Sequence, residues 1–387
     1  MAVPLVYSWR NLWTRRLTTA LTAGGMALVI FVFAATLMLA EGLRQTLVAT
    51  GSPGNVILLR KGSETEIQSG IERTSALALT AQPEIAQTPD ARAMAAREAV
   101  VLLSLTKKST GKASNVVIRG VEPASLPLRP QVRLIAGRLP KPGTPEIMVG
   151  QSLVKGFAGV GIGQALHFGK RDWPVVGIFS AGNSGFSSEI WGDVDQLLPA
   201  FGRRGFSVVV ARLARGTNFD AFKQSIETNP RFQVEAWRES DYYEKQSKMM
   251  RAFLTVLGVS LTAIFSLGAM IGAMITMYAA VANRVPEIGA LRAMGFSRGS
   301  ILTAFLLEAL LLGGVGGLAG IGLAAGLSFV TFSTTNFQTF SELAFRFAMT
   351  PKIIALSLGF SLLMGVVGGF LPAVRAARMT IVEALRQ

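Results

Sequence analysis

Residues 252–283 have the sequence AFLTVLGVSLTAIFSLGAMIGAMITMYAAVAN, a run of 32 residues without one charged side chain. A helix needs about 20 apolar residues to cross the hydrocarbon core of a bilayer. At about 1.5 Å per residue this run exceeds the thickness of that core, so we expect its helix to project beyond the membrane. The sequence therefore predicts a transmembrane helix over 251–283.

Three further runs are apolar and long enough to span a membrane. Of these, only the run that becomes helix 299–332 is interrupted by a charge, Glu308. Glu308 follows the start of its helix closely, so we expect it to face lipid headgroups or Arg298, in a structural role rather than on a substrate path. The predicted helices are 19–40, 299–332 and 352–374.

The first run could instead belong to a cleaved signal peptide. The apolar region of a signal peptide is about 7–15 residues long and ends at a site of small residues. This run is longer, and it ends in Met38-Leu-Ala-Glu41 without such a site. We therefore predict a retained anchor, and a membrane α-helical fold of four transmembrane helices with an α/β extracytoplasmic domain inserted between helices 1 and 2.

Residues 41–250 form the predicted α/β extracytoplasmic domain, including a helical stalk at each end, 41–50 and 242–250. The chain has no cysteine, so this domain must be held by packing and not by disulfides. Residues 182–188 are expected to be a flexible loop. β-branched runs predict strands at 55–60, 100–105, 115–120, 174–179 and 207–211, and helices are expected near 83–98, 193–202 and 218–228.

Orientation follows from lysine and arginine in the short segments beside the spans. Arginines mark the N-terminal segment, the turn 284–298 and the tail 375–387, which places these segments and both termini in the cytoplasm. The large domain and a short loop at 333–351 then lie outside a bacterial cytoplasmic (inner) membrane. Residues 1–18 predict an amphipathic helix in contact with membrane lipid, although they could also continue the first span.

The net charge of +15 does not indicate nucleic-acid binding, because the basic residues are dispersed. No G-x-x-x-x-G-K-[ST] loop is present, and the single histidine, His167, cannot form a multi-histidine metal site. We predict no catalytic residue, no metal site and no cofactor in this chain.

Glycines recur at small-xxx-small spacing in three of the predicted spans. Such glycines allow helix backbones to approach closely in lipid. They could serve packing within one bundle or a dimer interface, and the sequence leaves both open. The glycines are Gly268, Gly272, Gly313, Gly317, Gly320, Gly365 and Gly369.

The cytoplasmic turn contains a short predicted helix. Pro286 can open it, Glu287 suits its positive N-terminal dipole, and Gly295 can close it. Ile288 and Leu291 share one face with Arg292, and Met294 and Phe296 lie near the end. This face is predicted to be an exposed apolar patch that binds a partner.

The turn, NRVPEIGALRAMGFSRGSIL at 283–302, resembles the coupling helix of MacB/FtsX-type permeases of ABC transporters, with the pattern E-I-G-x-L-R-A-x-G. LPAVRAARMTIVEALR at 371–386 is similar to the family's C-terminal motif, with Ile381 where the family commonly has proline. Stretches at 137–150, 173–179 and 188–193 resemble its periplasmic core domain.

This resemblance implies that the chain docks a separate ABC ATPase subunit, which binds ATP and Mg. It also implies pairing with a second permease copy or paralogue, with a periplasmic adaptor as an additional partner in some members. The residues that the resemblance assigns to ATPase coupling are Arg284, Glu287, Ile288, Leu291, Arg292, Met294, Gly295 and Phe296.

Two functions remain open. The first is export of a lipophilic, peptide or lipoprotein-like substrate, which the size of the large domain favours. The second is transmission of force or a signal to an extracytoplasmic partner such as a cell-wall hydrolase. A sensor unconnected to an ATPase is opposed by the coupling motif. Because the spans are almost uncharged, we expect substrate to be handled by the outer domain; a transient opening lined by backbone, Ser and Thr is the alternative.

Overall fold

The computed structural model describes residues 16–336 and 339–380. They form two compact units. The helical unit contains the chain up to Glu41, Ala252–Val330 and the chain from Phe347; the sheet unit contains Gly42–Arg251 and Thr331–Arg346.

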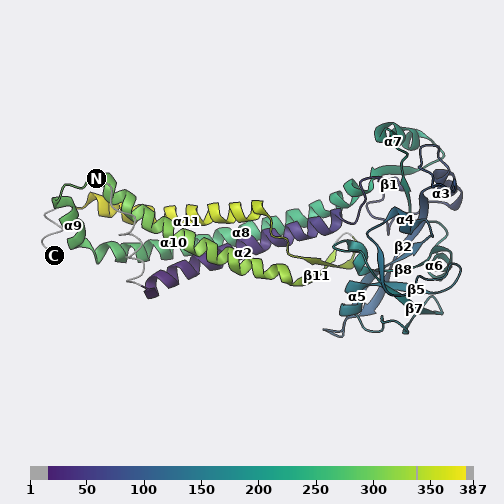
Figure 1. Ribbon diagram of the computed structural model, residues 1–387, viewed down its shortest axis with the longest axis horizontal. Coiled ribbons are helices and arrows are strands. Elements are labelled where there is room, and N and C mark those ends of the chain that lie inside the picture. Colours follow the sequence, from purple (N-terminus) through teal and green to yellow (C-terminus); the bar gives the residue numbers. More distant parts are fainter. Residues whose placement is uncertain (1–15, 337–338, 381–387) are drawn as a thin grey trace. The chain divides into compact units, whose positions relative to one another are not determined.

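Four long helices define the helical unit (Figure 1). Among the described residues, these four are long and apolar enough to cross a membrane, which confirms the predicted fold class. A short helix, α9, joins the second to the third. The helices are α2 (Arg16–Val48), α8 (Glu239–Ala282), α9 (Val285–Ala293), α10 (Arg298–Gly326, followed by the 3-10 turn η2, Leu327–Phe329) and α11 (Pro351–Arg378).

Side-chain caps fix where two of these helices begin. The hydroxyl of Ser297 accepts a hydrogen bond from the backbone N–H of Ser300 at the start of α10, and that of Thr350 accepts from Ile353 at the start of α11. Both bonds satisfy N–H groups that have no partner within the helix. Pro351 takes the first helical position of α11, where its missing N–H has no cost.

The helix ends differ from the predicted spans. α8 is a single helix of 44 residues, so the predicted stalk 242–250 is its first part. The predicted stalk 41–50 is likewise the end of α2 as far as Val48. Both parts belong to the sheet unit. α11 continues through Pro372 to Arg378, and the predicted amphipathic helix 1–18 lies outside the described residues except for the start of α2.

The sheet unit contains a ten-stranded mixed sheet within the residues that the structure describes. Its order is β10-β1-β9-β2-β3-β8-β5-β7-β4, with β6 paired to β7. The strands are β1 (Asn55–Arg60), β2 (Ala95–Thr106), β3 (Ala113–Val121), β4 (Arg133–Gly137), β5 (Ile147–Gly150), β6 (Ala165–Phe168), β7 (Arg171–Ser180), β8 (Glu189–Asp193), β9 (Val208–Arg212) and β10 (Val234–Arg238). The helices are α3 (Arg73–Thr80), α4 (Ser125–Leu128), α5 (Gln151–Gly156), α6 (Val194–Ala200) and α7 (Phe219–Thr228), with the 3-10 turn η1 (Gly185–Ser188).

Two apolar clusters hold this sheet to its helices. In one, Phe222 of α7 and Leu79 of α3 pack on Val56 and Val209 of β1 and β9. In the other, residues of α5 and α6 pack on β3, β5, β7 and β8, and Trp173 is fully buried. The cysteine-free domain is therefore held by packing around two neighbouring cores.

The five predicted strands and the helices near 193–202 and 218–228 are confirmed. The helix predicted at 83–98 is wrong. Pro89 interrupts helical hydrogen bonding, and Ala95 and Ala96 pair instead with β9 as the start of β2. Sheet pairing overrides the helix propensity of this alanine-rich stretch.

The segment 333–351, predicted as a loop, contains a β-hairpin, β11 (Thr331–Asn336) and β12 (Ser341–Arg346). Its alternation of polar and apolar residues is typical of a strand with two different faces. The backbone N–H of Ala344 donates to the hydroxyl of Ser188 at 3.1 Å, which ties the hairpin to the large domain.

The loop 182–188, predicted to be flexible, is structured. Ser184 and Ser187 are buried, and their hydroxyls donate to the backbone oxygens of Ala181 and Gly182. These hydrogen bonds hold the loop in one conformation despite its glycines.

Candidate functional site

The site predicted from the turn 284–298 is centred on α9. Gly295, at φ +95°, takes the left-handed conformation just after the helix, where glycine is favoured. Arg292 donates from Nη1 to the backbone oxygen of Phe296 at 3.1 Å and so holds the turn that follows. The predicted short helix is confirmed as Val285–Ala293, with Pro286 in its first turn and Gly295 just beyond its end.

The two faces of α9 differ from the prediction. Ile288 is only 2% exposed and packs with Met277 and Phe305 of α8 and α10, so its assignment to an exposed patch is wrong. The physical reason is that α9 lies against the ends of its neighbouring helices and buries its most apolar position. Leu291 is partly buried, whereas Met294 is 67% exposed. The exposed apolar surface of α9 is therefore concentrated at its C-terminal end.

A buried ion pair anchors the start of α9. The guanidinium of Arg284 donates from Nη1 and Nη2 to the two carboxylate oxygens of Glu308 on α10, at 2.9 and 3.3 Å. Glu308 therefore faces Arg284, and the expectation that it faces headgroups or Arg298 is wrong. Arg284, which the family resemblance assigns to ATPase coupling, is itself buried in the helical unit.

The predicted glycines fall into two groups. At Gly313, Gly317, Gly365 and Gly369, an added Cβ would lie 2.2–2.8 Å from atoms of the facing helix in the α10–α11 pair. At Gly320 it would lie 2.5 Å from the backbone oxygen of Ala27 on α2. These glycines allow close packing within one chain.

Gly268 and Gly272 on α8 form the second group, because an added Cβ would meet no atom within 4 Å at either position. Both line an apolar groove of about 680 Å³ between α2 and α8. In the apolar stretch of α8 only 17% is buried, against 39–44% in the corresponding stretches of the other three spans of the described chain. The most exposed apolar helix face in this unit therefore belongs to α8.

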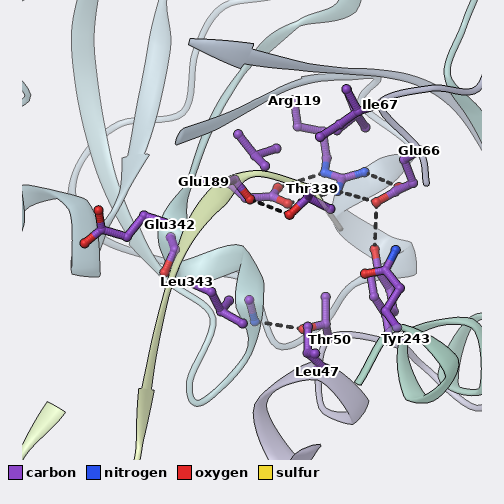
Figure 2. A pocket seen from close by; sticks show the side chains of 16 residues that line it. Leu47, Thr50, Glu66, Ile67, Arg119, Glu189, Tyr243, Thr339, Glu342 and Leu343 are labelled. Carbon is purple, nitrogen blue, oxygen red and sulfur yellow. Dashed lines mark hydrogen bonds and ion pairs between the residues drawn. The ribbon is translucent and has the colours of Figure 1, made fainter. Parts of the chain in front are cut away.

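A buried charge network in the sheet unit is a feature that the sequence analysis did not predict (Figure 2). Arg119 of β3 donates to Glu66 at 2.7 and 3.1 Å, to Glu189 at 2.8 and 2.9 Å, and to Glu98 at 3.0 Å. Arg129 also donates to Glu98. A cavity of about 50 Å³ lies beside Arg119 and Tyr243, large enough for a few water molecules.

Electrostatics favour the charged forms of Glu98 and Arg119 at the centre of this network. Desolvation acts to raise the pKa of the Glu98 carboxyl, but the guanidinium groups of Arg129 and Arg119 outweigh it and lower that pKa below its ordinary value. Burial acts to lower the pKa of Arg119, but the carboxylates of Glu189 and Glu66 raise it well above the usual range. The Glu98 carboxyl and the Arg119 guanidinium therefore remain ionised inside the domain.

The network also holds the start of α8 and the chain that follows α2. Glu239, the first residue of α8, accepts from the backbone N–H of Ser52 and from the amide of Asn55, both at 2.9 Å. Arg129 donates to the same carboxylate at 3.4 Å. An added Cβ on Gly51 would lie 2.6 Å from the backbone of Glu239, so the chain that follows α2 and the start of α8 are in tight contact.

No chemistry of bond cleavage follows from this arrangement. Within the described residues, no group of three His, Cys, Asp or Glu could hold a metal ion. His167, on β6, is exposed and its Nδ1 lies 2.7 Å from Asp172. The sequence signal for the network was present only as charged residues within apolar strands, such as Arg119 in NVVIRGV at 115–121.

Comparison with known proteins agrees with this architecture. The model of the MacB-like periplasmic core domain matches residues 19–229, and that of the FtsX-like permease C-terminal region matches residues 259–381. The chain is thus a multi-pass membrane protein of the ABC transporter permease class. It belongs to the family of MacB/FtsX-type permeases.

Individual relatives match parts of the chain. The macrolide export ATP-binding/permease protein MacB of Chromobacterium violaceum is 40% identical over 115 residues, 30% of this chain and 17% of the relative. The uncharacterized ABC transporter permease YknZ of Bacillus subtilis is 34% identical over 139 residues, which are 36% of this chain and 33% of the relative. MacB of Campylobacter fetus is 29% identical over 239 residues, which cover 58% of this chain and 35% of the relative. The matches thus span about a third or less of these relatives.

Among solved structures, the periplasmic region of MacB from Actinobacillus actinomycetemcomitans matches with a TM-score of 0.38 and 12% identity, over 52% of this chain and 95% of that one. The extracellular domain of YknZ from Gram-positive bacteria matches with a TM-score of 0.33 and 14% identity, over 44% and 88%.

Proposed function

We propose that this permease couples ATP hydrolysis in a separate ABC ATPase subunit to motion of its extracytoplasmic domain. ATP and Mg bind to that subunit, and α9 is its docking helix. The observation that carries the proposal is the division of α9 into an anchored part and an exposed part. Ile288 and the Arg284–Glu308 pair fix the helix to α10, while Met294 is exposed. A force applied at Met294 and Leu291 would therefore reach the long helices.

The charge network supports the second half of the proposal. Glu239 and the Ser52 backbone belong to one hydrogen-bonded cluster with the sheet. The start of α8 and the segment that follows α2 therefore cannot shift without moving the strands or breaking buried hydrogen bonds and ion pairs. Such pairs are costly to break. Movement of the helix ends is therefore passed to the sheet.

The two permeases of the working complex would meet along α8. Gly268 and Gly272 present an open small-residue face, which suits a second copy or a paralogue in lipid. Membership of this family favours a bacterial inner membrane, and the arginine-bearing turn and tail favour both termini in the cytoplasm.

The exported substrate would be lipophilic, peptide or lipoprotein-like, and the sheet unit would handle it, with or without a periplasmic adaptor. The second candidate is transmission of force to an extracytoplasmic partner such as a cell-wall hydrolase, which the rigid network favours equally. Cysteine crosslinking of a photoactive substrate separates the routes, with single cysteines along 268–277 and at the exposed Asn183, since Ser187 is buried. Continuous labelling through the membrane midplane and none at Asn183 would contradict the outer-domain route.

Docking is tested by co-purification with the cognate ABC ATPase. Leu291→Asp combined with Met294→Asp should abolish co-purification and ATPase-dependent activity, while membrane insertion is retained. Leu77→Asp combined with Phe340→Asp is the matched control, because it places the same two charges on exposed apolar residues of the sheet unit. Undiminished co-purification of the α9 variant would refute the docking helix.

A further inference from the structure

A second hollow in the sheet unit has a chemistry that neither the fold nor the coupling role requires. It encloses about 740 Å³ between α5, the 180–187 segment and the β11–β12 hairpin. All its lining residues belong to the sheet unit. It is far larger than the cavity beside Arg119 and can admit a small ligand.

The lining carries positive charge without a counter-charge. Lys155 of α5 and Arg346 of β12 both line the hollow, and neither has an ion-pair partner within the described part of the chain. The described lining contains no aspartate or glutamate. Neutral hydrogen-bonding groups complete it, including Gln151, Asn183 and Ser333.

The hairpin register places its polar groups on one face. Thr331 pairs with Arg346 and Ser333 with Ala344, and residues directly opposite each other on antiparallel strands share a face. Glu342 lies on this face too, but its carboxylate is engaged by Lys107 at 2.6 Å and by Ser114 at 3.0 Å. The charge of Arg346 is therefore not cancelled by its own strand.

We propose that this hollow binds the phosphate-ester group of a small anionic ligand. A guanidinium provides two parallel N–H donors to phosphate oxygens and an ammonium adds a point charge, while amides and hydroxyls donate to the remaining oxygens. The site goes beyond the proposed coupling function and does not depend on it.

Two sources of this chemistry exist, the headgroup of an anionic phospholipid and a soluble phosphate ester. The chain connects the hairpin directly to membrane-spanning helices, since Thr331 follows η2 by two residues and Arg346 precedes α11 by five. This connection favours the lipid headgroup as the source.

The test measures binding of two probes to the full chain in phosphatidylcholine nanodiscs. The probes are dihexanoyl-phosphatidylglycerol for the lipid source and glycerol 3-phosphate for the soluble source. Lys155→Gln combined with Arg346→Gln should lower the affinity for the probe that binds by about tenfold or more, because two charge-assisted contacts are lost. The charge-matched control, Lys61→Gln with Arg215→Gln, alters exposed residues elsewhere in the sheet unit and should leave binding unchanged.

Tight binding of the lipid probe alone assigns the lipid source, and equal binding of glycerol 3-phosphate assigns the soluble one. Ser333→Asp provides an independent variant, because it places a negative charge in the hollow at an exposed hairpin position and should also weaken binding. The proposal is overturned if neither probe binds the native chain, or if the control variant loses as much affinity as the pocket variants.

Discussion

Arg284 and Glu308 are 24 residues apart in the sequence, yet the guanidinium of one holds both carboxylate oxygens of the other inside the helical unit. Arg284 precedes α9 and Glu308 lies within α10, so the pair fixes the orientation of the short helix relative to the long one. An acid within a membrane span is a functional candidate by default. Here the ion pair with Arg284 gives a structural reason for the presence of Glu308 in the span.

The first prediction concerns this pair. Glu308→Gln leaves the guanidinium of Arg284 buried without a counter-charge, and breaking a buried pair costs about 3–5 kcal/mol. We expect a lower melting temperature of the purified chain and weaker co-purification with its ATPase, because α9 is no longer held. Loss of the helical circular-dichroism signal in detergent measures the melting temperature.

The paired variant Arg284→Met with Glu308→Leu is the control, because it removes both charges and should recover most of the lost stability. If Glu308→Gln abolished transport while stability and assembly stayed native, the structural role assigned to Glu308 would be contradicted, and a place on a substrate path would be favoured.

The second prediction ranks two changes in the charge network. Arg119→Met removes the cation from three carboxylates, Glu66, Glu98 and Glu189, and should cost about 3–5 kcal/mol or more. Glu98→Gln should cost less, because glutamine keeps an acceptor oxygen and the remaining carboxylates still balance the two guanidinium groups. Hydrogen exchange of the β2 and β3 amides measures both; the reverse order would contradict the network as described.

The third prediction follows from the lowered pKa of Glu98. A carboxyl whose folded pKa lies below its ordinary value of 4.5 contributes stability that is fully present above pH 4.5 and is lost as the pH falls through the folded pKa. The stability difference between the native chain and Glu98→Gln should therefore be constant near pH 7 and shrink below pH 4.5. Melting temperatures across that range test this; a difference that persisted unchanged at low pH would be inconsistent with the assigned ion pairs.

Particular residues show how far the sequence determined these findings. The spans were predictable because a bilayer demands long uncharged runs, and α9 because Pro286 and Gly295 mark its ends. The strand at Ala95 was not, since its state depends on pairing with β9. The network could not be predicted, because the partners of Arg119 lie 21–70 residues away and isolated charges in strands do not specify which others they meet. The inward face of Ile288 likewise depends on where α9 packs.

The last prediction separates the two groups of glycines. Gly365→Ala would place a Cβ 2.7 Å from the backbone oxygen of Ala309, and a backbone atom cannot move aside as a flexible side chain can. Overpacking of this kind costs about 1–3 kcal/mol, so the melting temperature of a single chain should fall. Gly268→Ala combined with Gly272→Ala adds Cβ atoms that meet no other atom within 4 Å, and the single chain should remain as stable as the native one.

If α8 forms the interface with a second permease, the Gly268/Gly272 variant should instead lose pairing in the membrane, because its backbone could no longer approach another helix closely. Crosslinking between copies through single cysteines introduced on α8 measures this, and the chain contains no native cysteine to interfere. Gly365→Ala serves as the reciprocal control, with reduced stability but unchanged crosslinking. A Gly268/Gly272 variant that paired normally would show that the open face of α8 contacts lipid, and another surface would have to join the two permeases.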